Sequence, residues 1–118
     1  HLNLLKLIDI TNHRSITIYC AIGNGHLKIV KWLISDDYKP DAYICSHAAL
    51  SGQLEILQWL RKNDYPWNMM VCTYAAMRGH LDVLQWAIVN GCNYDIYSMT
   101  TIARTNGHRE IVEWIQKI

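Results

Sequence analysis

Apolar residues recur at helical spacing in a segment that begins at Gly52 and runs to about residue 62. Its polar residues Glu55, Gln58 and Lys62 fall at positions i, i+3 and i+7, which places them on one narrow stripe of a helix. The rest of that helix surface is apolar. Because such a helix has to bury most of its circumference, the pattern predicts a helix that neighbours cover on two or three sides.

The same apolar segment occurs four times in the chain. Each copy starts with a glycine and ends with a tryptophan: Gly25 and Trp32, Gly52 and Trp59, Gly79 and Trp86, and Gly107 and Trp114. Subtracting the glycine positions gives spacings of 27, 27 and 28 residues. A fixed period of this size is typical of repeat proteins, in which each unit packs only against its neighbours.

A shorter helix is predicted before each glycine. Three of these helices follow a capping residue, whose side chain can accept hydrogen bonds from first-turn amides: Asp41, Asn68 and Asp95. A small residue stands four positions before each glycine and lets paired helices approach closely: Ala21, Ala48, Ala75 and Ala103. Gly91 can supply a left-handed cap after the third apolar helix. These features predict an all-α solenoid of stacked helix-turn-helix repeats.

We expect residues 1–118 to form one repeat array. The predicted units are 14–40, 41–67, 68–94 and 95–118, and residues 1–13 fit the second helix of a partial leading repeat. The chain is therefore expected to be an excerpt of a longer array. The predicted core consists of Leu27, Val30, Ala48, Leu54, Leu57, Ala75, Leu81, Leu84, Ala103 and Ile111, and Trp59 is expected to be mostly buried.

The amino-acid composition argues against several classes of protein. The net charge is +1, which gives no basic field to attract nucleic acid or a membrane surface, and no apolar run has the length of a membrane span. Four cysteines are too few for a disulfide framework, and their spacings match no zinc pattern. Buried thiols in a reducing compartment are expected, so the predicted location is intracellular, in cytoplasm or nucleus. We expect no metal and no cofactor.

Candidate catalytic groups are few. Histidine follows the repeat glycine in three copies, as His26, His80 and His108, and Gln53 takes its place in the fourth. A recurring position indicates a structural role, either capping the second helix or bridging to a neighbouring unit. Cys45 and His47 stand two residues apart, which points them to different sides of a helix, so a Cys-His nucleophile is not expected. We predict that the chain is not an enzyme.

The segment that contains Ala75, Ala76, Gly79, His80 and Leu81, followed by Asn90, Gly91 and Cys92, resembles the core of the ankyrin repeat. The resemblance recurs across residues 15–118. The short, tryptophan-ending units look like the ankyrin repeats of giant DNA viruses of amoebae and some protists, which implies a viral protein located in a host cell. The usual repeat is about 33 residues long, so the family's β-hairpin fingers are expected to be reduced or absent. The family's opening histidine is replaced by Tyr19, Ser46, Thr73 and Thr101.

The resemblance implies a scaffold for protein–protein interaction whose partner binds the concave face of first helices and turns. The two positions before each glycine face outward there and differ between copies, and Leu50 and Met77 are apolar at these positions. Aromatic or apolar residues also open the first helices. The candidate partner-binding residues are Tyr43, Leu50, Ser51, Met70, Met77, Arg78, Tyr97 and Asn106.

Two alternative functions remain. The tryptophans could form a base-stacking ladder in a nucleic-acid-binding helical repeat, although such a ladder needs interleaved Arg and Lys residues. The chain could also be the substrate-recognition arm of a larger protein, such as a ubiquitin-ligase adaptor. A protein partner of unknown identity is the main expectation, with no nucleic acid and no membrane.

Overall fold

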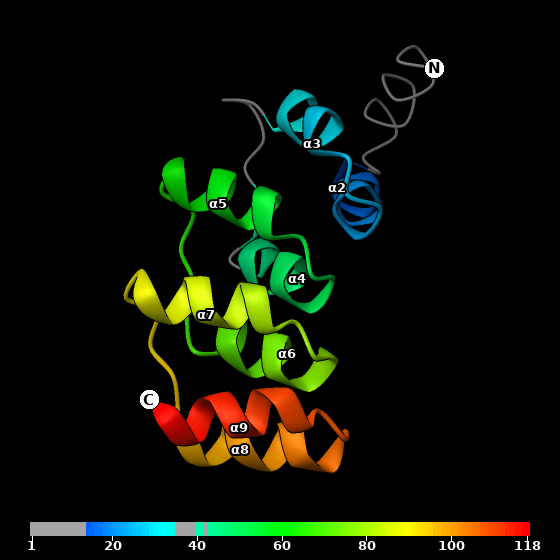
Figure 1. The fold of residues 1–118 in the computed structure, drawn as a ribbon. Coiled ribbons are helices and arrows are strands. Elements are labelled where there is room, and N and C mark those ends of the chain that lie inside the picture. Colours follow the sequence, from blue (N-terminus) through cyan, green and yellow to red (C-terminus); the bar gives the residue numbers. More distant parts are fainter. Residues whose placement is uncertain (1–13, 35–39, 42) are drawn as a thin grey trace.

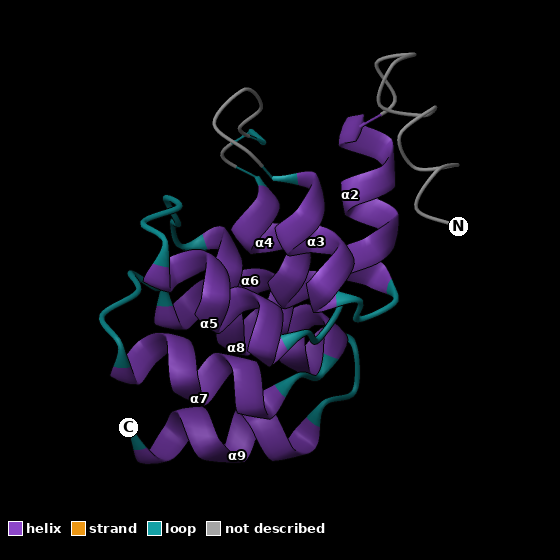
Figure 2. Ribbon diagram, turned by 90° about the horizontal axis from the view of Figure 1, so that it is seen from above, coloured by secondary structure: helices purple, strands orange, loops and turns teal. Residues whose placement is uncertain are grey.

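The computed structural model describes residues 14–34, 40, 41 and 43–118, so the predicted leading helix at 1–13 lies outside the described residues. The described part contains eight helices and no strand (Figures 1 and 2). The helices are α2 (Arg14–Gly23), α3 (Leu27–Leu33), α4 (Ile44–Leu50), α5 (Leu54–Lys62), α6 (Met70–Arg78), α7 (Leu81–Val89), α8 (Ile96–Thr105) and α9 (Arg109–Lys117). The all-α repeat fold is confirmed, and the connections at 63–69 and 90–95 form no β-hairpin finger.

The helices form four antiparallel pairs that stack into an elongated molecule of 48 × 25 × 18 Å. The pairs are α2/α3, α4/α5, α6/α7 and α8/α9, and they follow one another along the stack in Figure 1. The first helices α4, α6 and α8 pack closely on one another, whereas α5, α7 and α9 have few close backbone contacts among themselves. The solenoid therefore has a tight layer of first helices and a more open layer of second helices.

Side-chain caps begin the first helices, as the sequence predicts. Asp41 Oδ1 accepts a hydrogen bond from the Tyr43 amide at 3.0 Å. Asn68 Oδ1 accepts one from the Met70 amide at 2.9 Å, and Asp95 caps α8 in the same way. Each bond satisfies an amide that has no partner within its own helix.

The turn between the two helices of a pair needs glycine. Gly52 has a φ of +72° and Gly79 a φ of +78°, in the left-handed region that favours a residue without a Cβ atom. This turn reverses the chain within a few residues and starts the second helix at the following leucine. The predicted cap at Gly91 also adopts a left-handed φ, of +89°.

The core lies between the first helices and the inner sides of the second helices. Seven of the ten predicted core residues are at most 1% exposed: Val30, Ala48, Leu57, Ala75, Leu84, Ala103 and Ile111. Leu27, Leu54 and Leu81 are only half-buried, which corrects the prediction. Each is the first residue of its helix, beside the glycine turn, where no neighbour covers one side of the side chain.

Trp59 is also half-buried rather than mostly buried. The second helices stand apart, so the indole reaches toward the preceding repeat without being enclosed by it. The Lys31 Nζ atom from α3 lies 5.8 Å from the ring centroid. Trp32, in the preceding pair, is 39% exposed. The tryptophans of the repeat therefore fill gaps in the open layer, and their outer edges meet solvent.

Candidate partner-binding surface

Exposed apolar side chains lie at the start of successive first helices. Tyr43, just before α4, is 67% exposed, and Tyr97, in the first turn of α8, is 72% exposed. Between these two helices, Met70 begins α6 and is half-buried, and its neighbour Met69 is 46% exposed. Because α4, α6 and α8 pack side by side, these residues belong to one edge of the first-helix layer. We call them the first-helix row.

The other predicted binding residues lie at the opposite ends of the same helices. Leu50, Ser51 and Met77 are half-buried, whereas Arg78 is exposed. The sequence predicts that Leu50 and Met77 face solvent. In the structure both side chains are half-buried, so they are less exposed than predicted. A histidine from the next repeat lies at the same end of the first helix and bonds to the backbone there.

That histidine forms a bridge between repeats. His80 Nε2 donates a hydrogen bond to the Leu50 carbonyl at 3.2 Å, and His108 Nε2 donates to the Met77 carbonyl at 2.9 Å. Neither side chain caps its own helix. Of the two roles that the sequence left open, bridging is therefore confirmed for these two histidines. The Gln53 amide takes the corresponding place beside Gly25.

Asn106 has a local role. It is exposed, and its Nδ2 atom donates to the Ile102 carbonyl at 2.8 Å, one turn earlier in α8. Asn63 and Asn90 make the same bond to Trp59 and Trp86 at the ends of α5 and α7. The amide nitrogen of Asn106 thus satisfies a carbonyl at the helix end, and its side-chain oxygen faces solvent.

A surface pocket of about 350 Å³ extends the first-helix row along α8. Its lining residues are Tyr97, Ser98, Thr101, Ile102 and Thr105. They recur at i, i+4 and i+8, so they share one side of the helix. The pocket places the Tyr97 ring beside hydroxyl groups that can donate or accept hydrogen bonds.

Of the core thiols, Cys45 and Cys72 are not activated for nucleophilic attack, whereas a hydrogen bond from Cys72 lowers the pKa of Cys92. Burial raises the pKa of Cys45 to about 12, and its Sγ atom donates toward the Tyr65 carbonyl. A hydrogen bond donated to the Cys92 sulfur, together with burial, raises the pKa of Cys72. His47 turns away from Cys45 and donates to the Tyr19 carbonyl of the preceding repeat at 3.3 Å. The prediction that Cys45 and His47 point to different sides of α4 is confirmed.

Two further features, a metal site and a membrane-spanning helix, are absent from the described residues. These residues hold no group of three or more His, Cys, Asp or Glu side chains that could bind a metal ion. Among the helices described, none combines the length and apolar character that crossing a membrane requires.

Sequence reasoning missed two groups of exposed or clustered residues. Met69 and Ile96 lie directly after the caps of α6 and α8 and add apolar surface to the first-helix row. Trp67, which stands outside the repeat period, contacts both Trp86 and Arg61. The position of Trp67 outside the period was the only available signal of that second cluster.

A comparison with known proteins identifies the repeats. The family model for ankyrin repeats (many copies) matches residues 45–88, which run from α4 into α7. No curated protein matches the chain. The likeness to the tryptophan-ending repeats of viruses stays a prediction. The matched segment is thus an ankyrin-repeat segment, and the same helical pair recurs before and after it.

Proposed function

We propose that the chain is a non-catalytic scaffold that binds a protein partner along the first helices α4, α6 and α8. Ankyrin repeats are generally protein-interaction modules. The observation that carries this proposal is the first-helix row, where Tyr43 and Tyr97 are each about two-thirds or more exposed. Aromatic side chains in a row on a rigid surface are costly to leave in water and are favoured as interface anchors.

Within this proposal the eight candidate residues have different roles, which follow from the chemistry of their side chains. Tyr43, Met70 and Tyr97 are the apolar anchors, with rigid tyrosine rings that lose little conformational entropy on binding. Leu50 and Met77 extend the apolar area at the other helix ends. Ser51, Arg78 and Asn106 supply the polar contacts that set orientation. The packing positions repeat between units, so recognition is assigned to residues that differ between units.

Two observations support a non-catalytic role in a reducing, intracellular compartment. All four cysteines are free thiols, and Cys45, Cys72 and Cys92 are buried. The raised pKa of Cys45 keeps it protonated, because burial disfavours the thiolate. An arm that delivers bound substrates to a larger protein would use the same surface, since it also has to hold a protein partner.

Affinity capture from cell lysate tests the proposed surface. The immobilised chain is compared with a variant that combines Tyr43→Ser and Tyr97→Ser. Both side chains are exposed, so the variant should keep its fold, which a helical circular dichroism spectrum checks. Proteins that bind the wild-type chain should be lost from the variant, and direct binding of each is then measured with purified components.

Val89→Ser provides the matched control. Val89 is 81% exposed at the end of α7, away from the first helices, so this variant removes a similar exposed apolar group elsewhere. It should retain every partner. If the folded tyrosine variant retains them as well, the first-helix row is not the binding surface. A gel shift with random-sequence oligonucleotides at low salt tests the nucleic-acid alternative, which requires binding that weakens steeply as salt rises.

A further inference from the structure

A second candidate site lies in the layer of second helices, away from the first-helix row. A pocket of about 300 Å³ opens between the C-terminal ends of α5 and α7 and the connection that leads into α6. Its lining residues are Gln58, Arg61, Lys62, Trp67, Trp86 and Asn90. This volume is at the lower end of the range for ligand pockets, so it suits one or two side chains rather than a large cofactor.

Two indole rings form the apolar part of this pocket. The centroids of Trp67 and Trp86 are 5.7 Å apart at an interplanar angle of 63°, which is an edge-to-face arrangement. Both rings are half-buried, so each presents part of its surface to the opening. They offer a fixed apolar wall to a ligand group that enters beside them.

The Arg61 guanidinium is held against this wall. Its central carbon lies 4.4 Å from the Trp67 centroid, and its Nη1 atom donates a hydrogen bond to the Tyr65 carbonyl. Neither of these two partners of Arg61 is an anion. A guanidinium has five N–H donors in a planar fork, so several donors are left over. The position of Arg61 is thus defined by the protein, while donors remain for a ligand.

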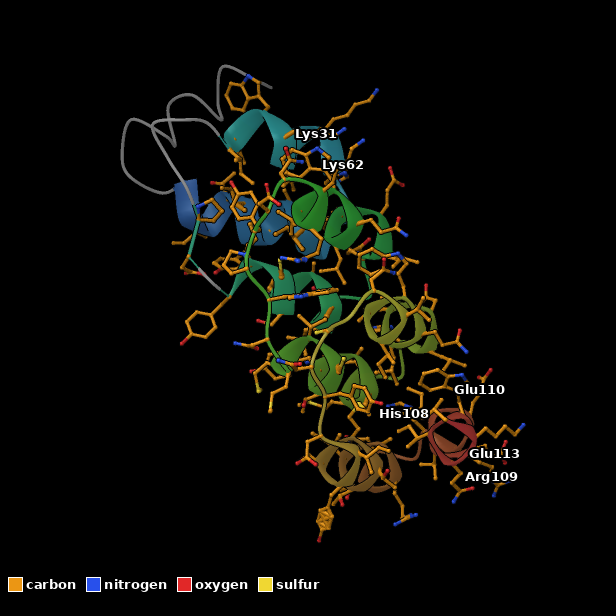
Figure 3. All side chains as sticks on the ribbon, turned by 90° about the vertical axis from the view of Figure 1, so that its left-hand side faces the viewer. Lys31, Lys62, His108, Arg109, Glu110 and Glu113 are labelled. Carbon is orange, nitrogen blue, oxygen red and sulfur yellow. The ribbon has the colours of Figure 1, made fainter. Side chains whose placement is uncertain are left out.

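The two charged residues that line the pocket, Arg61 and Lys62, are both basic. Lys62 follows Arg61 in the last turn of α5 and is exposed, and the six lining residues include no carboxylate. Glu55, the acidic residue of the first turn of α5, is about two helical turns from Lys62. In Figure 3, Lys31 and Lys62 lie toward the α3 and α5 end of the stack, whereas α9 at the other end carries Glu110 and Glu113 together with Arg109. An anionic ligand is therefore favoured at this end.

The anion is better matched by a protein carboxylate than by nucleic acid. Base stacking needs open ring faces, but Arg61 covers a face of Trp67 and Lys31 lies over Trp59. The second helices α5, α7 and α9 also each carry an acidic residue in the first turn: Glu55, Asp82 and Glu110. A phosphate backbone that followed this layer would meet repeated negative charge.

We propose that this pocket binds a glutamate or aspartate side chain of a partner protein, with an adjacent apolar side chain packed on Trp67 and Trp86. Arg61 provides a charge-assisted, two-point hydrogen bond to the carboxylate, and Lys62 adds a second positive charge. The site is a second interaction surface that is separate from the first-helix row. A partner that touches both surfaces would wrap around the edge of the stack that the C-terminal ends of α5 and α7 form.

The test uses a capped octapeptide in which glutamate and leucine alternate, and the same peptide with glutamine in place of glutamate. Binding is followed by ¹⁵N nuclear magnetic resonance, using the indole N–H signals of Trp67 and Trp86 and the side-chain N–H signal of Arg61. The glutamate peptide should shift these three signals saturably. The glutamine peptide should bind about tenfold more weakly, because it lacks the charge that Arg61 and Lys62 attract.

Lys62→Glu should weaken binding of the glutamate peptide about tenfold, since it turns an attraction into a repulsion. Lys62 is exposed, so this variant should keep its fold. Lys117→Glu is the matched control, because Lys117 is an exposed basic residue in the last turn of α9. It should bind as the wild type does.

Any of the following results would overturn the proposal. One is equal binding of the glutamate and glutamine peptides, or shifts that map outside the pocket at millimolar peptide. Another is a Lys62→Glu variant that binds as well as Lys117→Glu. The third is a single-stranded oligonucleotide that shifts the same signals more tightly than the acidic peptide, which would make this a nucleic-acid site.

Discussion

The imidazole ring of His80 fills the space that a side chain on Gly52 would need. A Cβ atom built on Gly52 would lie 2.6 Å from the His80 Cε1 atom, closer than two carbons can approach. The Nε2 atom of the same ring bonds to the Leu50 carbonyl, two residues before the glycine. Glycine at this position therefore serves both the left-handed turn and the contact with the next repeat. His108 and Gly79 form the same pair one unit later.

Gly52→Ala should destabilise the protein more than Gly107→Ala. Both glycines have a left-handed φ, +72° and +76°, so both variants incur a backbone strain of about 1–2 kcal/mol. Only at Gly52 does the added methyl group also meet a ring, whereas nothing lies within 4 Å of it at Gly107. The additional loss should be about 1–3 kcal/mol, as for other overpacked sites. Chemical denaturation measures the difference, and equal losses would contradict the steric role of His80.

The clash predicts non-additivity between two substitutions. In a chain that already carries His80→Ala, the Gly52→Ala change should lose its steric cost and retain only the backbone strain. A double-mutant cycle measures this coupling. If the changes in the free energy of unfolding were additive, the His80 ring would be able to move away from the added methyl group at no energetic cost.

His108→Ala should lower the free energy of unfolding by about 1 kcal/mol, because the bond to the Met77 carbonyl is lost. His108→Gln should recover most of that loss. Gln53 occupies the corresponding position beside Gly25, which shows that a glutamine side chain fits this place in the repeat. Denaturant titrations of the three proteins test the order of stability. A glutamine variant as unstable as the alanine variant would argue against a hydrogen-bonding role.

The repeat positions were predictable because they recur. Val30, Leu57 and Leu84 hold equivalent places in three units, so each copy reinforces the assignment of the others to the core. The partner of the Leu50 carbonyl was not predictable from the local sequence, since His80 lies 30 residues later. The Arg61–Trp67 contact also escaped prediction. It spans a turn between helices, and its ring orientation depends on how α5 and α7 are spaced.

Leu57→Ala should cost more stability than Trp59→Ala, although tryptophan is the larger side chain. Leu57 is fully buried, and its truncation should leave a cavity that costs about 2–5 kcal/mol. Trp59 is half-buried in the open layer, so part of the space that it vacates fills with water. The two free energies of unfolding test this order, and a larger loss for Trp59→Ala would restore a buried role for that ring.

Alkylation should distinguish one cysteine from the other three. Cys20 is exposed, whereas Cys45, Cys72 and Cys92 are buried. Iodoacetamide at neutral pH should modify Cys20 first, and the other thiols should react only when the protein unfolds. Mass spectrometry of peptides over time gives the order. Rapid modification of Cys45 in the folded protein would indicate an activated thiol and reopen the question of catalysis.

Stability should fall at alkaline pH partly because of Cys45. Burial raises the pKa of this thiol from 9.0 to about 12, so folding favours its protonated form. The resulting stabilisation is complete below about pH 9 and is lost as the pH rises toward 12. A Cys45→Ala variant should therefore lose less stability than the wild type between about pH 8 and pH 10.5. Equal losses would show that ionisation of Cys45 is not coupled to folding.

Because the same glycine–histidine contact joins successive repeats, one repeat should be removable without a new kind of junction. Removing residues 53–79 would join Gly52 directly to His80, so that α4 acquires α7 as its second helix. His108 would then meet Gly52 in place of Gly79, with the same left-handed turn to receive its ring. The shortened chain should fold as the same stack with one repeat fewer. Length could therefore be adjusted in steps of one unit without redesigning any junction.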